Sequence, residues 1–287
     1  MAYAVTAELR VLIVKNLCRI ATSALLALYV AAAAAQNPSF KVAHTMNYKG
    51  GVDLTADGVP YNPIVYESAL VQPRPSDEPV TQEALKRTLG SIKQGPFPTV
   101  LDIERWPVDT PDVDRRRVNI EKLVDVLKRA REARPGMQYG YYGEVPVRVY
   151  WRVVDSAHPA QRAAWKQRND QALRDLIPHV DAIFPSLYNL DDDARRWEFN
   201  SRNILTEARK FGKPMYCYLW PQFHTNNKLL AGQYVSRELW RLELDTCREL
   251  ADGIVIWNHA PNSEWDPLAP WWQETLAFLR ANGLSPR

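Results

Sequence analysis

Short apolar runs alternate with longer amphipathic segments from about residue 40 to the end of the chain. The runs have the length and the β-branched and aromatic content of strands, and several are apolar at nearly every position, as in strands covered on both faces. In one intervening segment apolar residues recur at helical spacing among charged ones, namely Ile120, Leu123, Val124 and Leu127. The predicted strands are VAHTM, PIVYES, PTVLDIE, MQYGYY, DAIFPSLY, PMYCYLW and DGIVIWN.

Strands that alternate with helices predict a parallel sheet with helical crossovers. Seven such strands in a chain of 287 residues favour an α/β fold with a single TIM-like (β/α) barrel of about seven parallel strands. No linker rich in Gly or Ser interrupts the pattern. Residues 36–287 are therefore predicted to form one domain.

Residues 1–35 have a different composition. Three basic residues precede the stretch IATSALLALYVAAAAAQ, which is apolar and ends in small residues. This arrangement predicts a secretory signal peptide cleaved near Ala34 or Ala35, and so a secreted or periplasmic protein. A single membrane anchor is the alternative, although the apolar run is short for a full span.

Net charge, motifs and cysteine content limit the partners, cofactors and disulfides that we expect. The chain has 36 basic and 33 acidic residues, and loss of residues 1–35 leaves it nearly neutral, which argues against a nucleic-acid partner. Zinc-type Cys/His spacing and nucleotide-binding motifs are both lacking, so we expect neither metal nor cofactor. We expect a monomer without membrane contact after signal cleavage. Cys217 and Cys247 remain, either as a disulfide or as two buried thiols.

Two carboxylates stand at the end of one predicted strand, in the segment TVLDIERWP. Residues i and i+2 of a strand point to the same face, so Asp102 and Glu104 are expected to share one environment, with Ile103 on the helical side. Two like charges in a partly desolvated place raise the pKa of one member. A carboxylic acid that stays protonated near neutral pH can protonate a leaving-group oxygen, as glycosidic cleavage requires. The alternative is a structural ion pair, for instance with Arg105.

Several other predicted strands end in polar or aromatic residues. In a barrel, side chains at the carboxyl ends of the strands converge on one mouth. Aromatic rings at this mouth could stack on sugar rings. Aromatic residues also fill ordinary protein cores, and for Tyr188 and Trp257 a place in the barrel core is the alternative. The residues concerned are Glu67, Tyr141, Tyr142, Tyr188, Trp220 and Trp257. His224 and Glu144 follow strands too, but we expect both to be solvated surface residues.

Four motifs resemble the hyaluronidase family of glycoside hydrolases. VLDIERWP, YGYYGEVPVRVYW, AIFPSLYN and ADGIVIWN occur in the order and approximate spacing of that family, over about residues 97–260. The resemblance implies a distorted barrel of about seven strands and a retaining, substrate-assisted hydrolysis of N-acetylhexosaminide bonds in a polysaccharide. Residues 36–287 would then form the catalytic domain.

The resemblance also implies roles for individual residues. Glu104 would be the acid and base, while Asp102 and Tyr188 would orient and stabilise the N-acetyl group during its attack. Trp257 would form the pocket floor against the acetyl methyl group. Further substrate contacts are expected from aromatic residues at or near the strand ends, namely Tyr150, Tyr142, Trp106 and Trp220.

The chain departs from the family pattern in two places. Ile103 stands where animal members have an aromatic residue, and no Cys-containing turn follows Tyr142. These departures leave the substrate open between hyaluronan and another glycan with N-acetylglucosamine or N-acetylgalactosamine. A barrel that binds glycan without cleaving it, and a hydrolase of a different cell-wall or capsule polysaccharide, also stay open.

Overall fold

The computed structural model describes residues 40–74, 76–148 and 158–285, without the side chains of 171–173. They belong to one compact unit, Ser39–Arg287. The predicted signal peptide (1–35) and Tyr150 lie outside the described residues, so export and the role of Tyr150 stay predictions.

The described strands form three small sheets, and every pairing within them is parallel. The sheet orders are β1–β7–β6, β3–β4–β5 and β2–β8. Six of the seven predicted strands are present; five are shortened at both ends, and the first runs from Lys41 to His44 instead of from Val42 to Met46. The strands are β1 Lys41–His44, β2 Asn47–Tyr48, β3 Ile64–Tyr66, β4 Thr99–Asp102, β5 Tyr139–Tyr141, β6 Tyr216–Leu219, β7 Gly253–Ile256 and β8 His259–Ala260.

Helices occupy the amphipathic segments between the strands. Four of them begin at a Ser, Thr or Asp whose side-chain oxygen accepts a backbone N–H three residues later, as at Thr81 and Asp112. The α-helices are α2 Gln82–Gly90, α3 Val113–Ala133, α4 Pro159–Leu176, α5 Ala194–Arg209, α6 Arg237–Leu250 and α7 Pro270–Ala281, and short 3₁₀ turns are η1 Thr55–Asp57, η2 Glu67–Ala69 and η4 Ile177–His179.

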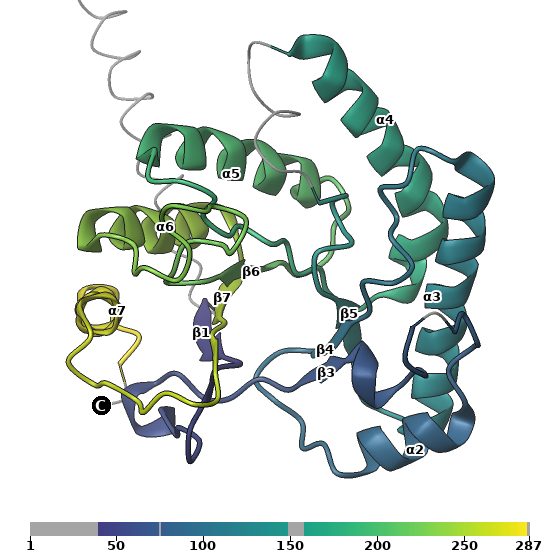
Figure 1. Cartoon of the computed structure of the whole chain (residues 1–287), viewed down its shortest axis with the longest axis horizontal. Helices are drawn as coiled ribbons and strands as arrows, with labels where there is room; N and C mark the ends of the chain where they lie inside the picture. Colours follow the sequence, from purple (N-terminus) through teal and green to yellow (C-terminus); the bar gives the residue numbers. More distant parts are fainter. Residues whose placement is uncertain (1–39, 75, 149–157, 286–287) are drawn as a thin grey trace, which may run out of the picture. The chain divides into compact units, whose positions relative to one another are not determined.

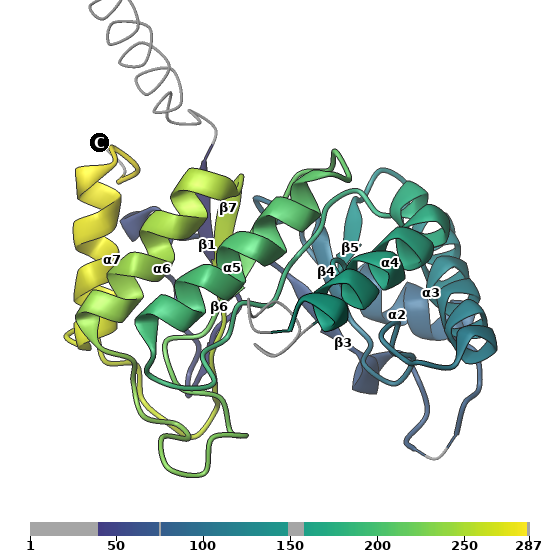
Figure 2. The same ribbon diagram turned by 90° about the horizontal axis from the view of Figure 1, so that it is seen from above.

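The helices pack in sequence order around the sheets (Figure 1). Helix α3 contacts α2 and α4 beside β3–β4–β5, and α6 contacts α5, α7 and β7 beside β1–β7–β6. Figure 2 shows α5, α6 and α7 side by side and α4 next to α3. Helix α3 buries Ile120, Leu123 and Leu127, which confirms the helical spacing that predicted it. The core lies between these helices and the strands.

The parallel α/β class is confirmed, but the predicted closed barrel is not present as one continuous sheet among the described residues. The seventh predicted strand, 181–188, makes only single parallel bridges, through Ile183, Phe184 and Ser186. Pro185 accounts for the interruption, because proline has no backbone N–H to donate to a ladder. Its carbonyl oxygen still accepts the N–H of Tyr218, at 2.9 Å.

Two further expectations concern membranes and cysteines. None of the helices in the described part of the chain is both long and apolar enough to cross a bilayer. Cys217 on β6 and Cys247 on α6 are free thiols, and both are buried. The alternative of two buried thiols, rather than a disulfide, therefore holds in this structure.

Gly140 on β5 allows a close approach of the neighbouring 182–184 segment. A Cβ atom at this position would lie 2.4 Å from the carbonyl oxygen of Ala182 and 2.7 Å from the ring of Phe184. Backbone on one side and a buried ring on the other leave no room for a methyl group. The close contact holds β5 against the segment that leads to Tyr188.

We expect Gly140→Ala to lower the free energy of unfolding by about 1–3 kcal/mol or more, because the added methyl group overpacks the core. Gly90→Ala is the matched control, since a Cβ at Gly90 meets nothing within 4 Å. Denaturant unfolding of both variants measures the difference. Equal stability of Gly140→Ala and the wild type would contradict the close contact.

Candidate active site

Most of the side chains predicted at the strand ends lie at one edge of the parallel strands. Tyr141 does not, because it is buried and its hydroxyl donates to the carbonyl oxygen of Leu123 on α3 at 2.8 Å. Asp102 is the last residue of β4 and pairs in register with Tyr66, the last residue of β3. Trp220 and Trp257 directly follow β6 and β7, which are paired through Leu219 and Ile256. Parallel pairing places the strand ends within each sheet on the same side, and one cavity is lined by Asp102 from the first sheet and by Trp220 and Trp257 from the second. The topology thus brings together residues far apart in the sequence.

Two cavities meet at the carboxylate pair. The first, of about 420 Å³, is lined by Asp102, Glu104 and Trp257 together with Tyr142, Arg148, Tyr188, Tyr218, Trp220 and His224. The second, of about 460 Å³, shares Asp102, Glu104 and Trp257 with the first. It adds Tyr66, Glu67, Ser68, Arg74 and His259. The shared residues form the boundary between the two cavities.

Asp102 is the carboxyl group with the strongly perturbed pKa. Burial raises its pKa from 3.8 to about 7, the charges of Glu104 and Glu67 raise it as well, and Arg148 lowers it. Its Oδ1 atom is buried and has no hydrogen-bond partner among the described residues. The crowding argument from the sequence therefore applies to Asp102, which holds a proton near neutral pH.

Glu104 has different surroundings. It lies two residues beyond the end of β4, and its side chain is 48% exposed. Its Oε1 accepts a hydrogen bond from Nη1 of Arg148 in an ion pair. Arg148 also lies over the ring of Tyr142, 5.6 Å from its centroid. This guanidinium group partly neutralises the carboxylate pair in the resting structure.

Aromatic rings form the wall of the first cavity. Tyr188 stacks on Trp257 with centroids 5.5 Å apart and planes at 25°, and Trp220 meets Trp257 edge-on at 4.7 Å. The hydroxyl groups of Tyr142 and Ser186 are 2.9 Å apart. Burial raises the pKa of both Tyr142 and Tyr188 above the ordinary range, so these phenols stay protonated.

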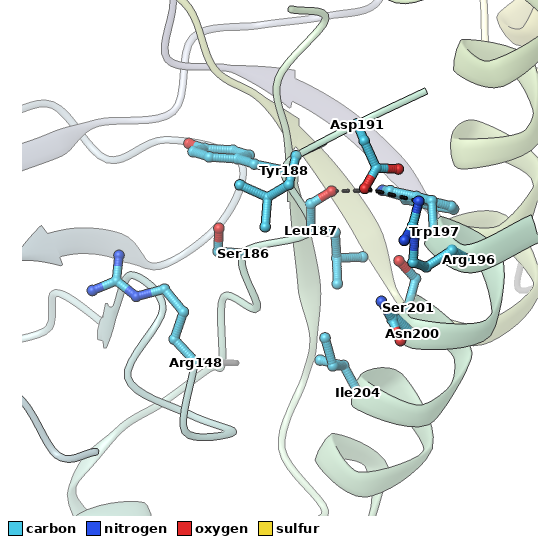
Figure 3. Close-up of a pocket in the computed structure, with 11 residues that line it drawn as sticks. Arg148, Ser186, Leu187, Tyr188, Asp191, Arg196, Trp197, Asn200, Ser201 and Ile204 are labelled. Atoms are coloured by element: carbon cyan, nitrogen blue, oxygen red, sulfur yellow. Dashed lines mark hydrogen bonds and ion pairs between the residues drawn. The ribbon is translucent and has the colours of Figure 1, made fainter. Parts of the chain in front are cut away.

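The segment that carries Tyr188 is attached to the start of α5. The indole Nε1 of Trp197 donates to the carbonyl oxygen of Leu187 at 2.8 Å (Figure 3). Arg196 pairs with Asp191 at 3.2 Å. These contacts fix the backbone on both sides of Tyr188, so its ring position does not depend on a regular strand.

Two solved structures are similar to this chain. A crystal structure of bee venom hyaluronidase has a TM-score of 0.56 and 17% sequence identity, over 85% of this chain and 99% of that chain. The complex of bee venom hyaluronidase with a hyaluronic acid tetramer has a TM-score of 0.53 and 17% identity, over 85% of this chain and 98% of that chain. The chain has a hyaluronidase-like fold. No family model and no curated protein sequence matches it.

The hyaluronidase-like fold does not bring every predicted residue to the site. Trp106 is 2% exposed and lines neither cavity that contains the carboxylates. Its Nε1 donates to Asp77 at 2.6 Å, and Lys122 lies over its ring. The expected contact of Trp106 with substrate therefore has no geometric support.

The expectation that Glu144 is a surface carboxylate is wrong. Its side chain is buried, and burial raises its pKa to about 8. Its Oε2 accepts the backbone N–H of Val108 at 3.1 Å, so Glu144 fastens the loop that follows Trp106. Gly143, with φ of 66°, makes the turn that directs the chain inward before Glu144.

Sequence reasoning missed Arg148 and undervalued His224. His224 was expected to be solvated, yet it lines the first cavity and meets Trp220 edge-on at 5.9 Å. Burial and the charge of Arg148 lower its pKa. The one feature of the sequence that points to either residue as part of the site is its position shortly after a predicted strand. Among the described residues, no group of three or more His, Cys, Asp or Glu is arranged to hold a metal ion.

The raised pKa of Asp102 predicts a pH-dependent cost to stability. The folded-state pKa of about 7 exceeds the ordinary 3.8, so the cost is absent below pH 4, grows as pH rises and is complete above pH 7. Asp102→Asn should raise the free energy of unfolding at pH 8 by up to about 4 kcal/mol and change it little at pH 4.

Denaturant unfolding at the two pH values measures this effect, with the exposed Asp192→Asn as control. The control should change stability by less than about 0.5 kcal/mol at either pH. An equal gain for Asp102→Asn at pH 4 and pH 8 would show that Asp102 is not protonated in the folded protein.

Proposed function

We propose that this protein is a glycoside hydrolase that cleaves N-acetylhexosaminide bonds of a polysaccharide by a retaining, substrate-assisted mechanism. The observation that carries the proposal is the position of Asp102 and Glu104 at the boundary of two cavities, beside the stacked rings of Tyr188 and Trp257. The similarity to bee venom hyaluronidase supports the fold that this chemistry requires.

In this mechanism the nucleophile belongs to the substrate. The acetamido carbonyl oxygen attacks the anomeric carbon while the bond to the leaving oxygen breaks. Asp102 accepts the acetamido N–H through the carboxyl group that it presents to the cavities, with Tyr188 beside it. Positive charge then develops on the cyclic intermediate, and the Asp102 carboxyl group beside it stabilises that charge.

Glu104 transfers the proton. It gives its proton to the leaving oxygen in the first step, and then takes one from the water that attacks the anomeric carbon and opens the cyclic intermediate. Its half-exposed side chain has the access to water that this second step needs. Because Arg148 forms an ion pair with Glu104, Arg148 has to release Glu104 before the first proton transfer.

Glu67 is a third carboxylate beside the pair, but its surroundings make it a poor nucleophile. Its Oε2 accepts the backbone N–H groups of Glu104 and Arg105, at 3.1 and 3.0 Å. Its Oε1 faces Arg105 and Arg74, at 3.5 and 3.6 Å. A carboxyl group that is engaged by three hydrogen-bond donors and a second guanidinium group has little tendency to attack carbon, which supports attack by the substrate's own acetamido group.

The two cavities suggest how a polymer would bind. They lie on either side of the boundary formed by Asp102, Glu104 and Trp257, so a chain that occupies both would be cut between them. Trp257 presents its ring to both cavities and can stack on a sugar face. Its Nε1 donates to the hydroxyl of Tyr66 at 3.0 Å, which holds the ring in place.

We also propose that the small sheets belong to one distorted barrel. Single parallel bridges connect their edges, His44 with Tyr61, Tyr142 with Phe184, and Ile183 with Met215. With these bridges the order β1–β3–β4–β5, the segment 182–186, β6 and β7 returns to β1, in agreement with about seven strands. The proposal explains why all the site residues share one mouth.

A glycan-binding protein without turnover is the second candidate. The ion pair between Arg148 and Glu104 favours it, because a side chain that is engaged with Arg148 is not free to protonate a leaving group. The perturbed pKa of Asp102 speaks against it, since binding alone does not require a buried carboxyl group of this kind.

The first experiment replaces the acid. Glu104→Gln should reduce the release of reducing ends from an N-acetylhexosamine polymer by about 10²–10⁴-fold, because the amide cannot transfer the proton. Glu264→Gln is the control, since Glu264 is 73% exposed and pairs with Lys49 outside the two cavities. Circular dichroism should show that both variants are folded. Full activity of Glu104→Gln would remove Glu104 as the acid.

The second experiment tests participation of the substrate. The purified protein is given a panel of polysaccharides with and without N-acetyl groups, and reducing ends are measured. We expect cleavage only where the sugar that contributes the anomeric carbon carries an acetamido group, because this group supplies the nucleophile. Efficient cleavage of glucose-only polymers would refute the mechanism, and binding without cleavage across the panel would favour the second candidate.

A further inference from the structure

Glu67 occupies a place in the site to which no role has been assigned. It directly follows β3, as the first residue of η2, and β3 pairs with the strand that ends at Asp102. It lines the second cavity together with Asp102 and Glu104, and its side chain is 24% exposed. Glu67 is thus a partly buried carboxylate in contact with the segment that carries the proposed acid.

The contacts of Glu67 are directed at the backbone of that segment. Two successive N–H groups, those of Glu104 and Arg105, donate to the single atom Oε2 at 3.1 and 3.0 Å. Consecutive backbone N–H groups that converge in this way form an anion-binding concavity. Hydrogen bonds to an ionised acceptor are stronger than those between neutral groups.

The segment needs such an anchor because it has left the sheet. Strand β4 ends at Asp102, so the N–H of Glu104 has no partner in a strand ladder. Arg105 adds a second attachment, since its Nη1 donates to the carbonyl oxygen of Ser76 at 2.9 Å. The backbone of Glu104 is therefore held from the loop after β3 rather than from its own strand.

We propose that Glu67 is a positioning residue that holds the backbone of Glu104 in place for proton transfer. The inference rests on the proposed function of Glu104. Glu67 itself touches neither proton nor anomeric carbon in this scheme. Its contribution is the fixed position of the chain at Glu104, and a displacement of about 1 Å in a catalytic group costs on the order of 10²-fold in rate.

The charge of Glu67 has a separate effect on Asp102. The charged groups that act on Asp102 are Glu104 and Glu67, which raise its pKa, and Arg148, which lowers it. The phenols of Tyr66, Tyr142, Tyr188 and Tyr218 also face it, and all of them are neutral near pH 7. Loss of the Glu67 charge should therefore lower the pKa of Asp102.

Two substitutions separate the hydrogen bonds from the charge. Glu67→Gln keeps a carbonyl oxygen that can accept both N–H groups and removes the charge, whereas Glu67→Ala removes both. Glu78→Gln makes the same charge change at an exposed position outside the two cavities and serves as the control. The kcat and KM of each variant are measured on an N-acetylhexosamine polymer.

We expect Glu67→Ala to lower kcat by about 10²-fold with KM changed less than threefold, and Glu67→Gln to stay within about tenfold of the wild type. Glu78→Gln should match the wild type. A kcat of Glu67→Ala within threefold of the wild type would overturn the proposal. Equal losses in the two Glu67 variants would overturn it too, because the charge rather than the positioning would then be what matters.

Two measurements on the unliganded protein do not depend on activity. Hydrogen exchange at the amides of Glu104 and Arg105 should speed up at least tenfold in Glu67→Ala and remain slow in Glu67→Gln. A ¹³C carboxyl titration should show a lower Asp102 midpoint in both variants. If the wild type cleaves no glycan, the proposed function fails, while the amide exchange still decides whether Glu67 holds the segment. If Glu67→Ala does not fold, the test falls to Glu67→Gln: fast hydrogen exchange at the amides of Glu104 and Arg105 in that variant would overturn the proposal.

Discussion

Parallel strand pairing is the constraint on which the rest of this structure depends. Every pairing within the three sheets is parallel, so the carboxyl ends of neighbouring strands lie at one edge. Residues that directly follow these ends meet there without any local sequence relationship. The carboxyl groups of Asp102 and Glu104 lie beside Glu67, which follows β3, in one cavity and beside Trp220, which follows β6, in the other, and Trp257, which follows β7, lines both.

Acidic groups lie close together at that edge and repel one another when charged. Two features of the structure reduce this repulsion. Asp102 is buried, and it keeps a proton near neutral pH rather than a charge. Glu104 and Glu67 stay in contact with cationic groups, Arg148 for the former and Arg74 with Arg105 for the latter. The same neighbourhood thus contains one buried carboxyl group with a raised pKa and two carboxyl groups that are paired with arginines.

The aromatic wall and the carboxylates are joined in one contact system. Trp257 stacks with Tyr188, meets Trp220 edge-on and donates its N–H to Tyr66 at the end of β3. Tyr66 in turn pairs in register with Asp102. The ring on which a sugar would stack is therefore attached to the strand next to the one that carries the buried carboxyl group.

The sequence by itself determined the elements and the edge at which they meet. Six of the seven strands predicted from apolar runs are present, and the i, i+2 spacing of Asp102 and Glu104 placed both beside the same cavities. Only the tertiary structure decided burial and partners. The Arg148–Glu104 pair and the Glu67 bond to the Glu104 backbone join residues 44 and 37 positions apart. The burial of Trp106 and Glu144 likewise depends on which segments cover them, and no local pattern of polar and apolar residues carries that information.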